Sequence, residues 1–199
     1  MAHATEYYKN LFGIAPGNLC HIDGNLWPLE EKISSEDNDE LTKPFSIEEI
    51  KKVLFDMKSN RAPGPDNIPA EFYQHCWEVV APDLFAMFEW FYEGKLDVQR
   101  LNYGIITLLP KSTDASRIQQ YIPICLLCCP YKLITKVMDL RVSKYAHKLF
   151  SIQQNAFIKG RHIVDGILSL HEVIHYTHVK KQMGVVLKLD FEKAYDKVN

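Results

Sequence analysis

The sequence predicts an α+β fold, rich in α/β character, on three observations. Helix-like runs are interspersed with short β-branched stretches over 199 residues, hydrophobic residues make up 47% of the chain, and aromatic residues make up 12%. This composition is typical of a folded protein rather than a disordered one. The length suits one domain or slightly more, and no internal repeat is visible. We therefore expect one main packed region.

The first part of the chain predicts a short helix followed by a polar linker. The helix is expected from Glu6 to Phe12, and the acidic stretch SSEDNDE at 34–40 is expected to be mobile. Ser46 then precedes Glu49 by three residues, the spacing of a capping box. Apolar residues at helical spacing follow as far as Met57, and the helix is expected to end near Ser59.

A proline-rich loop separates this helix from the next. The stretch RAPGPDNIP at 61–69 contains three prolines and one glycine, which predicts a rigid, non-helical loop. Residues 70–92 predict one helix, because their apolar side chains recur at helical spacing. The apolar stripe consists of Phe72, Trp77, Val80, Leu84, Phe88 and Phe91.

Short extended segments and helices alternate in the second half. GIITLLP at 104–110 predicts a buried strand, and YIPICLL at 121–127 predicts a second extended piece. Residues 131–149 predict an amphipathic helix, with Leu133, Val137, Leu140 and Leu149 facing inward and Lys132, Lys136, Lys144 and Lys148 facing out. A helix at 162–180 and a strand at 184–190 complete the order.

Charge is distributed unevenly along the chain. The formal net charge is −2, but residues 1–50 hold 3 basic and 10 acidic residues, whereas residues 100–199 hold 15 basic and 7 acidic ones. A basic half favours polyanions such as nucleic acid, although solvated cations on helix surfaces explain the same count. No apolar run is long enough for a membrane span and the start lacks a signal peptide, so we expect no membrane partner and an intracellular location, in nucleus or cytoplasm.

The five cysteines do not predict a disulfide framework. Cys125 and Cys128 form a single C-x-x-C inside an apolar run, whereas a structural zinc site needs four ligands. We expect these cysteines to be buried and structural.

Carboxylates near the end of the chain suggest a metal site. Asp190 follows an apolar strand, and a carboxylate at such a position is a hard oxygen ligand suited to Mg²⁺. Asp196 lies six residues further on. That spacing is about 20 Å along a strand or about 9 Å along a helix, too far for ions about 3.5–4 Å apart. The predicted ligand set is therefore incomplete.

A rival pattern is HEVIH at 171–175. On a helix it places His171 and His175 on one face with Glu172 as a possible base, as in zinc metalloproteases. Position 181, where one protease class has a third histidine, is Lys181, and Glu192 follows the expected strand rather than a second helix. We expect these histidines to lie on a polar helix face.

Ordered motifs resemble the reverse transcriptases of non-LTR (LINE-type) retrotransposons, most closely those of plants. LDFEKAYD at 189–196 is similar to their first palm motif, D-x-x-x-A-[FY]-D. It is preceded, in the family's order, by NRAPGPDNIPAEFY at 60–73, ITLLPK at 106–111, YIPICLL and YKLITKV at 121–137, and QQNAFIKGR at 153–161. The resemblance covers roughly residues 45–199 and implies a truncated right-hand polymerase fold, comprising the fingers and the first palm strand.

The resemblance implies three segments and a set of site residues. Residues 1–44 are the helix and acidic linker that precede the domain, 45–182 the fingers region, and 183–199 the first palm strand and its motif. Asp190 and the backbone carbonyl of Phe191 are implied ligands of Mg²⁺, with Asp190 catalytic. The implied nucleotide-binding residues are Lys111 and Tyr195, and the implied nucleic-acid-binding residues are Gln154 and Arg161.

The implied partners are an RNA template, a DNA primer and deoxynucleoside triphosphates, and the resemblance fixes no oligomeric state. The complete enzyme would add deoxynucleotides under template direction. Two departures weigh against activity of this chain. Ile122 stands where the family has an arginine, and the chain stops before the paired catalytic aspartates of the family. The alternative is a catalytically dead nucleic-acid-binding remnant.

Overall fold

The computed structural model describes residues 2–12 and 33–189, which fall into two compact units. One unit is continuous and spans Lys32–Ser151. The other combines Met1–Glu31 with Ile152–Asn199. The described part mixes helices with a two-stranded antiparallel sheet, as the α+β prediction requires.

The continuous unit starts with two helices that begin at serine caps. These are α2 (Ser35–Thr42) and α3 (Ile47–Phe55). The hydroxyl of Ser34 accepts a hydrogen bond from the amide of Asp37 at 3.1 Å, and that of Ser46 accepts one from the amide of Glu49 at 3.2 Å. The Ser46 half of the predicted capping box is confirmed, whereas the Glu49 side chain pairs with Arg141. The acidic stretch 34–40, expected to be mobile, forms α2 instead, because a serine cap and acidic residues in the first turn both stabilise a helix N-terminus.

The expected helix over 70–92 is divided at Cys76. Its parts are α4 (Ala70–His75) and α5 (Trp77–Tyr92), and a short α6 (Val98–Leu101) follows. The side-chain amide of Gln74 donates to the carbonyls of Leu54 at 2.8 Å and Met57 at 3.1 Å. These bonds attach α4 to the C-terminal end of α3, where the Leu54 carbonyl also accepts from the amide of Met57 at 3.2 Å.

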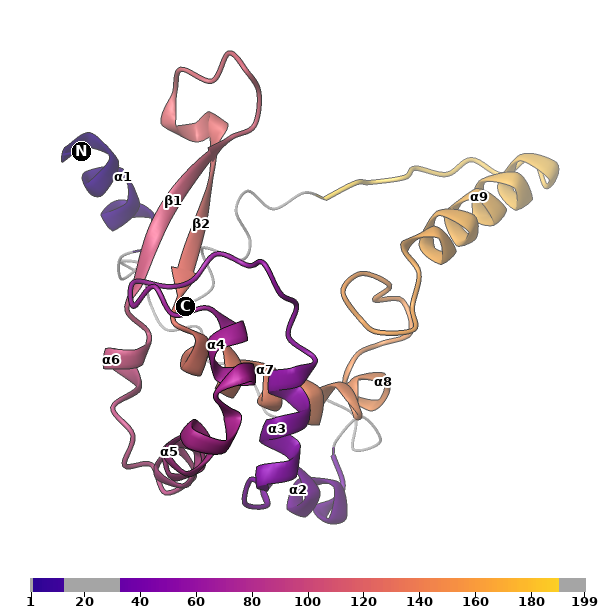
Figure 1. Cartoon of the computed structure of the whole chain (residues 1–199). Coiled ribbons are helices and arrows are strands. Elements are labelled where there is room, and N and C mark those ends of the chain that lie inside the picture. The colour runs from indigo at the N-terminus through magenta and orange to yellow at the C-terminus, as the bar shows by residue number, and fades with distance from the viewer. Residues whose placement is uncertain (1, 13–32, 190–199) are drawn as a thin grey trace. The chain divides into compact units, whose positions relative to one another are not determined.

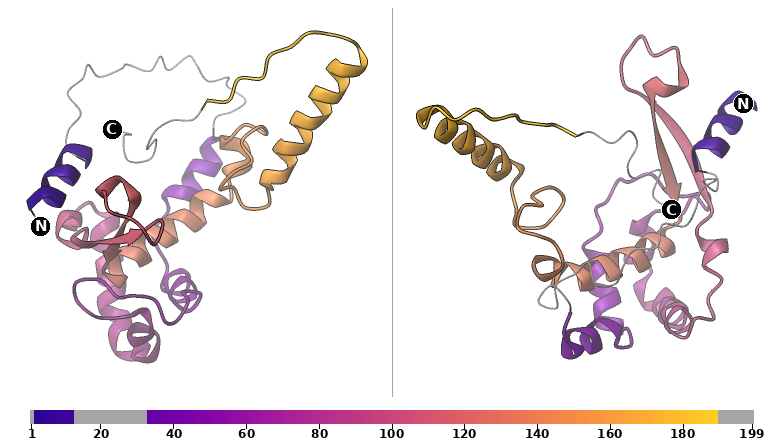
Figure 2. Two further views of the ribbon diagram at one scale, coloured as in Figure 1. Left: turned by 90° about the horizontal axis from the view of Figure 1, so that it is seen from above. Right: turned by 180° about the vertical axis from the view of Figure 1, so that it is seen from behind.

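The two strands form an antiparallel hairpin (Figures 1 and 2). Strand β1 (Gly104–Pro110) pairs with β2 (Tyr121–Leu127), and the short 3₁₀ helix η3 (Ile118–Gln120) lies in the loop between them. Both extended segments are therefore confirmed. The expectation that β1 is buried is wrong, since Ile105 and Ile106 are 48% and 45% exposed. A buried strand needs cover on both faces, and β1 chiefly contacts β2 among the described elements.

The predicted helix over 131–149 also appears in two parts, α7 (Cys129–Ser143) and α8 (Ala146–Leu149). It starts before Tyr131 because Pro130 is tolerated in the first turn, where its missing N–H would have no helical partner. The inward positions Leu133 and Val137 are fully buried, as predicted.

A hydrophobic core lies among α3, α4, α5 and the start of α7. Its largest fully buried side chains are Phe88, Ile50, Leu54, Leu133 and Val137. The loop 61–69 is non-helical as expected, and its Gly64 is buried against the junction of β2 and α7. A Cβ atom at Gly64 would overlap the backbone of Leu127 and Cys128, so only glycine fits there without a shift.

The second unit contains α1 (Ala2–Phe12) and α9 (Ile163–Val179). Helix α9 closely matches the helix predicted at 162–180. None of its residues is buried, although many are apolar. Residues 184–189, predicted as part of a strand, pair with no described strand, and Val185 is 95% exposed. A strand forms only where a neighbouring strand takes its backbone hydrogen bonds, so an apolar β-branched run is not sufficient.

Candidate functional site

Three of the expected site residues lie outside the described residues. Asp190, Phe191 and Tyr195 fall in the stretch 190–199, so their roles stay predictions. The three others are described. Lys111 belongs to the continuous unit, whereas Gln154 and Arg161 belong to the other.

Lys111 lies where the chain leaves β1 and enters the hairpin loop. Its backbone amide donates to the carbonyl of Gln120 at 2.8 Å, which closes the loop opposite the strand end. The loop is held further by the Gln120 side-chain oxygen, which accepts from the amides of Ser116 and Arg117, both at 2.9 Å. The Lys111 side chain is exposed. Its backbone is therefore fixed while its charge is accessible to an anion.

Arg117 and Ile122 lie near the position where the resemblance implies an arginine and this chain has isoleucine. Ile122 lies on β2 opposite Leu109 and is 46% exposed. Arg117 is exposed in the same loop as Lys111. The hairpin thus carries two exposed cations, and an apolar side chain stands at the position where the family has its arginine.

Gln154 and Arg161 are brought together by a hydrogen bond. The Arg161 guanidinium Nη1 donates to the backbone carbonyl of Gln154 at 2.8 Å, and the Gln154 side-chain amide donates to the carbonyl of Ala156 at 3.3 Å. Between them, Phe157 has φ 64° and Gly160 has φ 84°, both in the left-handed region. These two turns fold the segment back on itself, so the two expected nucleic-acid-binding residues share one loop.

This loop continues into the start of α9 around a pocket of about 650 Å³. Its lining includes Gln153, Asn155, Arg161 and Asp165. With its amide oriented to suit both neighbours, Asn155 donates to the carbonyl of Ile152 at 3.1 Å and accepts from the amide of Gly166 at 2.9 Å. Polar groups therefore line a hollow beside the two residues that the sequence pattern singled out.

The histidines of HEVIH lie on α9, and His171 and His175 are exposed. No residue of this helix is buried, so the expected polar face stays a prediction. Within residues 2–12 and 33–189, no group of three or more His, Cys, Asp or Glu side chains could hold a metal ion. Glu192 lies outside the described residues. No described geometry therefore favours a zinc site.

The cysteines near the hairpin are free thiols in different environments. Cys129 is buried, as expected, and burial raises the pKa of its thiol to about 11. Cys128 is half-buried, and burial also raises the pKa of its thiol. The expectation of burial is wrong for Cys125, which is exposed because β2 is open on that face. Raised pKa values keep the thiols of Cys128 and Cys129 protonated and unreactive at neutral pH.

A cluster of cations lies around a second pocket and was not predicted from the sequence. Lys58 and Arg61 flank the start of the proline-rich loop, and Lys132 and Lys136 on α7 line the same pocket. The two α7 lysines were expected to face outward, without a common site. The sequence does show Lys58 and Arg61 beside the rigid loop 61–69, but nothing in the sequence alone places that loop against α7.

None of the helices in the described part of the chain is both long enough and apolar enough to cross a membrane.

Two comparisons relate the chain to known proteins. The model of the family described as reverse transcriptase (RNA-dependent DNA polymerase) matches residues 109–199. A protein described as "Transposon TX1 uncharacterized 149 kDa protein", from Xenopus laevis, is 29% identical over 199 residues, which cover 98% of this chain and 15% of that protein. The chain thus spans a small part of the length of this relative. The expected resemblance of the chain to plant enzymes stays a prediction. The motif order and the matched segment agree, and both comparisons support a reverse transcriptase domain of a non-LTR retrotransposon.

Proposed function

We propose that residues 45–182 form the fingers and residues 183–199 the first palm strand of an RNA-directed DNA polymerase, with residues 1–44 preceding the domain. The observation that carries this proposal is the extent of the family match. It begins at Leu109, two residues before Lys111, and includes Gln154, Arg161 and Asp190. All six expected site residues therefore lie inside one matched segment, although the motif at 60–73 lies before it.

In this proposal Lys111 binds the triphosphate of the incoming nucleotide. Its exposed ammonium group at the end of β1, on a loop fixed by the Gln120 hydrogen bonds, supports that role. Gln154 and Arg161 contact the template. Their shared loop and the adjoining polar pocket support that second role. Tyr195 would exclude a 2′-hydroxyl by steric repulsion, a form of selectivity against a competing ligand.

The donor set proposed for the metal is the carboxylate of Asp190 with the carbonyl oxygen of Phe191. Both are hard oxygen donors, and their chemistry fits Mg²⁺, which keeps further sites for water and phosphate oxygens. When bound, Mg²⁺ would stabilise the charge on the attacking and leaving oxygens of phosphoryl transfer. The reaction of the whole enzyme is template-directed addition of deoxynucleotides to the 3′-hydroxyl of a primer.

We expect residues 1–199 by themselves to bind an RNA template annealed to a DNA primer without extending it. The sequence contains no pair of adjacent aspartates, and Ile122 provides no charge-assisted hydrogen bond to a triphosphate. Ile122 is also the observation that favours the second candidate, a nucleic-acid-binding remnant of such an enzyme. The two candidates differ only in whether a nucleotide is bound beside the primer end.

Photocrosslinking tests the proposal and separates the two candidates. The chain is incubated with primer–template, Mg²⁺ and a photoreactive deoxynucleoside triphosphate, and the labelled peptide is identified by mass spectrometry. We expect label in the peptide that contains Lys111, and its loss in Lys111→Ala but not in the control Lys95→Ala, whose side chain is 70% exposed on the same unit. Binding of primer–template without labelling of the Lys111 peptide would favour the nucleic-acid-binding remnant. Absence of both the binding and the label would overturn the proposal.

A further inference from the structure

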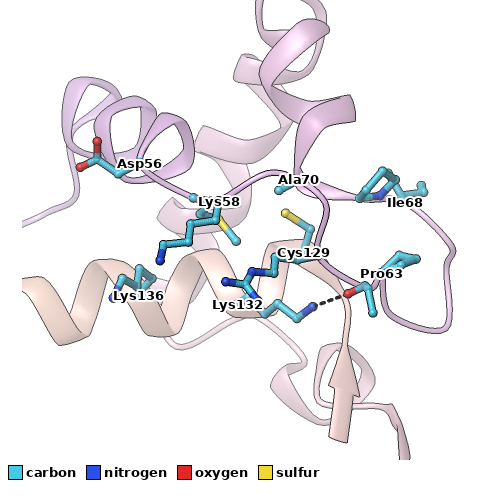
Figure 3. Close-up of a pocket in the computed structure, with 12 residues that line it drawn as sticks. Asp56, Lys58, Pro63, Ile68, Ala70, Cys129, Lys132 and Lys136 are labelled. Carbon is cyan, nitrogen blue, oxygen red and sulfur yellow. Dashed lines mark hydrogen bonds between the residues drawn. The ribbon is translucent and has the colours of Figure 1, made fainter. Parts of the chain in front are cut away.

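A pocket of about 490 Å³ lies between the end of α3, the proline-rich loop and α7 (Figure 3). Four cations and one carboxylate line it. The cations are Lys58, Arg61, Lys132 and Lys136, and the carboxylate is Asp56. All the lining residues belong to the continuous unit. The volume is in the range of small-ligand sites.

The cations of this pocket are largely without counter-charges. Among the described residues, Lys58, Arg61 and Lys132 form no ion pair within 4.0 Å, and Lys136 pairs with Asp139 at 3.3 Å. The ammonium group of Lys132 instead donates to the backbone carbonyl of Ala62 at 3.2 Å, which holds it over the loop (Figure 3). Cations converging on one hollow repel one another, and a bound anion would relieve that repulsion.

The rest of the lining is mainly apolar. Met57, Pro63, Ile68 and Pro69 contribute to it, and the two prolines restrict the motion of the loop. Inorganic phosphate alone would leave this apolar surface uncovered. A ligand with an anionic group and a flat apolar body would use both parts, and a nucleotide has this combination.

We propose that this pocket binds one nucleotide, with its phosphate among Lys58, Arg61 and Lys132 and its base against Ile68 and the prolines. The nucleotide is either a unit of a single strand or a free mononucleotide. This inference rests on the proposed function and extends it to a third contact, made by residues other than Lys111 and those of the Gln154–Arg161 loop. An acidic peptide is the competing ligand.

Fluorescence anisotropy with a labelled single-stranded oligonucleotide tests the phosphate contact in the full chain. The double variant Lys58→Ala/Arg61→Ala removes two exposed pocket cations, and Lys95→Ala/Arg100→Ala removes two exposed cations of the same unit from outside the pocket. We expect the pocket variant to bind at least about tenfold more weakly and the control to stay within about twofold of wild type. Equal losses in both variants would reduce the effect to net charge and overturn the inference.

An abasic oligonucleotide tests the base contact. The abasic strand should bind wild type more weakly than the normal strand does. In Ile68→Ser this difference in affinity should be smaller, because loss of the base and loss of the Ile68 side chain remove the same apolar contact. An unchanged difference in Ile68→Ser would overturn the placement of the base. Circular dichroism verifies that each variant is folded.

Competition distinguishes the sources of the nucleotide. Displacement of the oligonucleotide by adenosine monophosphate would assign a free mononucleotide, and displacement only by unlabelled oligonucleotide would assign a strand. Displacement by a polyglutamate peptide alone would overturn the inference in favour of an acidic peptide. If the pocket variants bind like wild type while the Lys111 crosslink persists, this inference alone fails. If the crosslink is absent while binding still depends on Lys58 and Arg61, the proposed function fails alone.

Discussion

Arg141 of α7 forms a bidentate ion pair with Glu49 of α3. The guanidinium Nε donates to Oε1 at 2.8 Å, and Nη2 donates to Oε2 at 2.7 Å. The remaining donors reach the backbone carbonyls of Leu41, Lys43 and Pro44, and the guanidinium lies 4.1 Å from the centroid of the Phe45 ring. One side chain thus satisfies a carbonyl in the last turn of α2 and two just after it, and joins that segment to α7.

Replacing Arg141 is expected to destabilise the continuous unit strongly. The residue is 6% exposed and the Glu49 side chain is 27% exposed, so Arg141→Ala leaves the Glu49 carboxylate and three carbonyls without this partner in a partly buried site. Breaking a fully buried ion pair costs about 3–5 kcal/mol, and because water reaches Glu49 we expect a loss at the lower end, about 3 kcal/mol. Urea unfolding should show this loss, with a smaller one for Arg141→Lys, whose ammonium group cannot bind in a bidentate manner. Arg100→Ala is the control, because its side chain is 87% exposed. A loss below about 1 kcal/mol for Arg141→Ala would contradict the assignment.

The same pair predicts a pH dependence of stability. The hydrogen bonds from Arg141 lower the pKa of the Glu49 carboxyl below its ordinary value of 4.5, against a smaller opposing effect of burial. A lowered pKa in the folded state means that the stabilisation is complete above pH 4.5 and is lost as the pH falls through the folded-state pKa. The difference in free energy of unfolding between wild type and Glu49→Gln should therefore shrink in acid.

Urea titrations at a series of pH values measure that difference. Glu48→Gln is the matched control, since Glu48 is exposed in the same helical turn, and it should change stability by less than about 0.5 kcal/mol. A wild-type advantage over Glu49→Gln that grows toward low pH would show that the sign is wrong.

Gly64 provides a test of the packing between the proline-rich loop and α7. In Gly64→Ala the new methyl group would overlap the backbone of Leu127 and Cys128, which cannot move as a flexible side chain can. Overpacking of this kind costs about 1–3 kcal/mol, measurable by urea unfolding. Gly184→Ala meets nothing within 4 Å and is expected to be neutral. Equal stability of both variants would show that the loop does not pack against this junction.

Local secondary structure was predicted from the sequence better than the burial and packing of the same elements. The cap at Ser46, the two strands and the helix at 163–179 follow from short-range chemistry that is readable within a few residues. The break at Cys76, the exposure of β1 and the buried role of Arg141 depend on what packs nearby, which local pattern does not contain. For the candidate site, the motifs predicted two residues that lie in one loop, Gln154 and Arg161, whose role stays a prediction. The pocket of Lys58 and Lys132 arises instead from a contact between segments about seventy residues apart.

Helix α9 is expected to be the least protected long helix in hydrogen exchange. None of its residues is buried, whereas α7 has five buried residues, including Leu133 and Val137. A helix that lacks tertiary packing is marginal in water, so its amides open locally more often than those of a packed helix. Exchange read by mass spectrometry should therefore be faster in peptides from 163–179 than in those from 129–143. The same exchange measurement is repeated with primer–template bound. Slower exchange in α9 alone would then mean that the ligand orders this helix. Protection of α9 equal to that of α7 in the free chain would mean that its apolar face is covered in solution, contrary to its exposure in the structure.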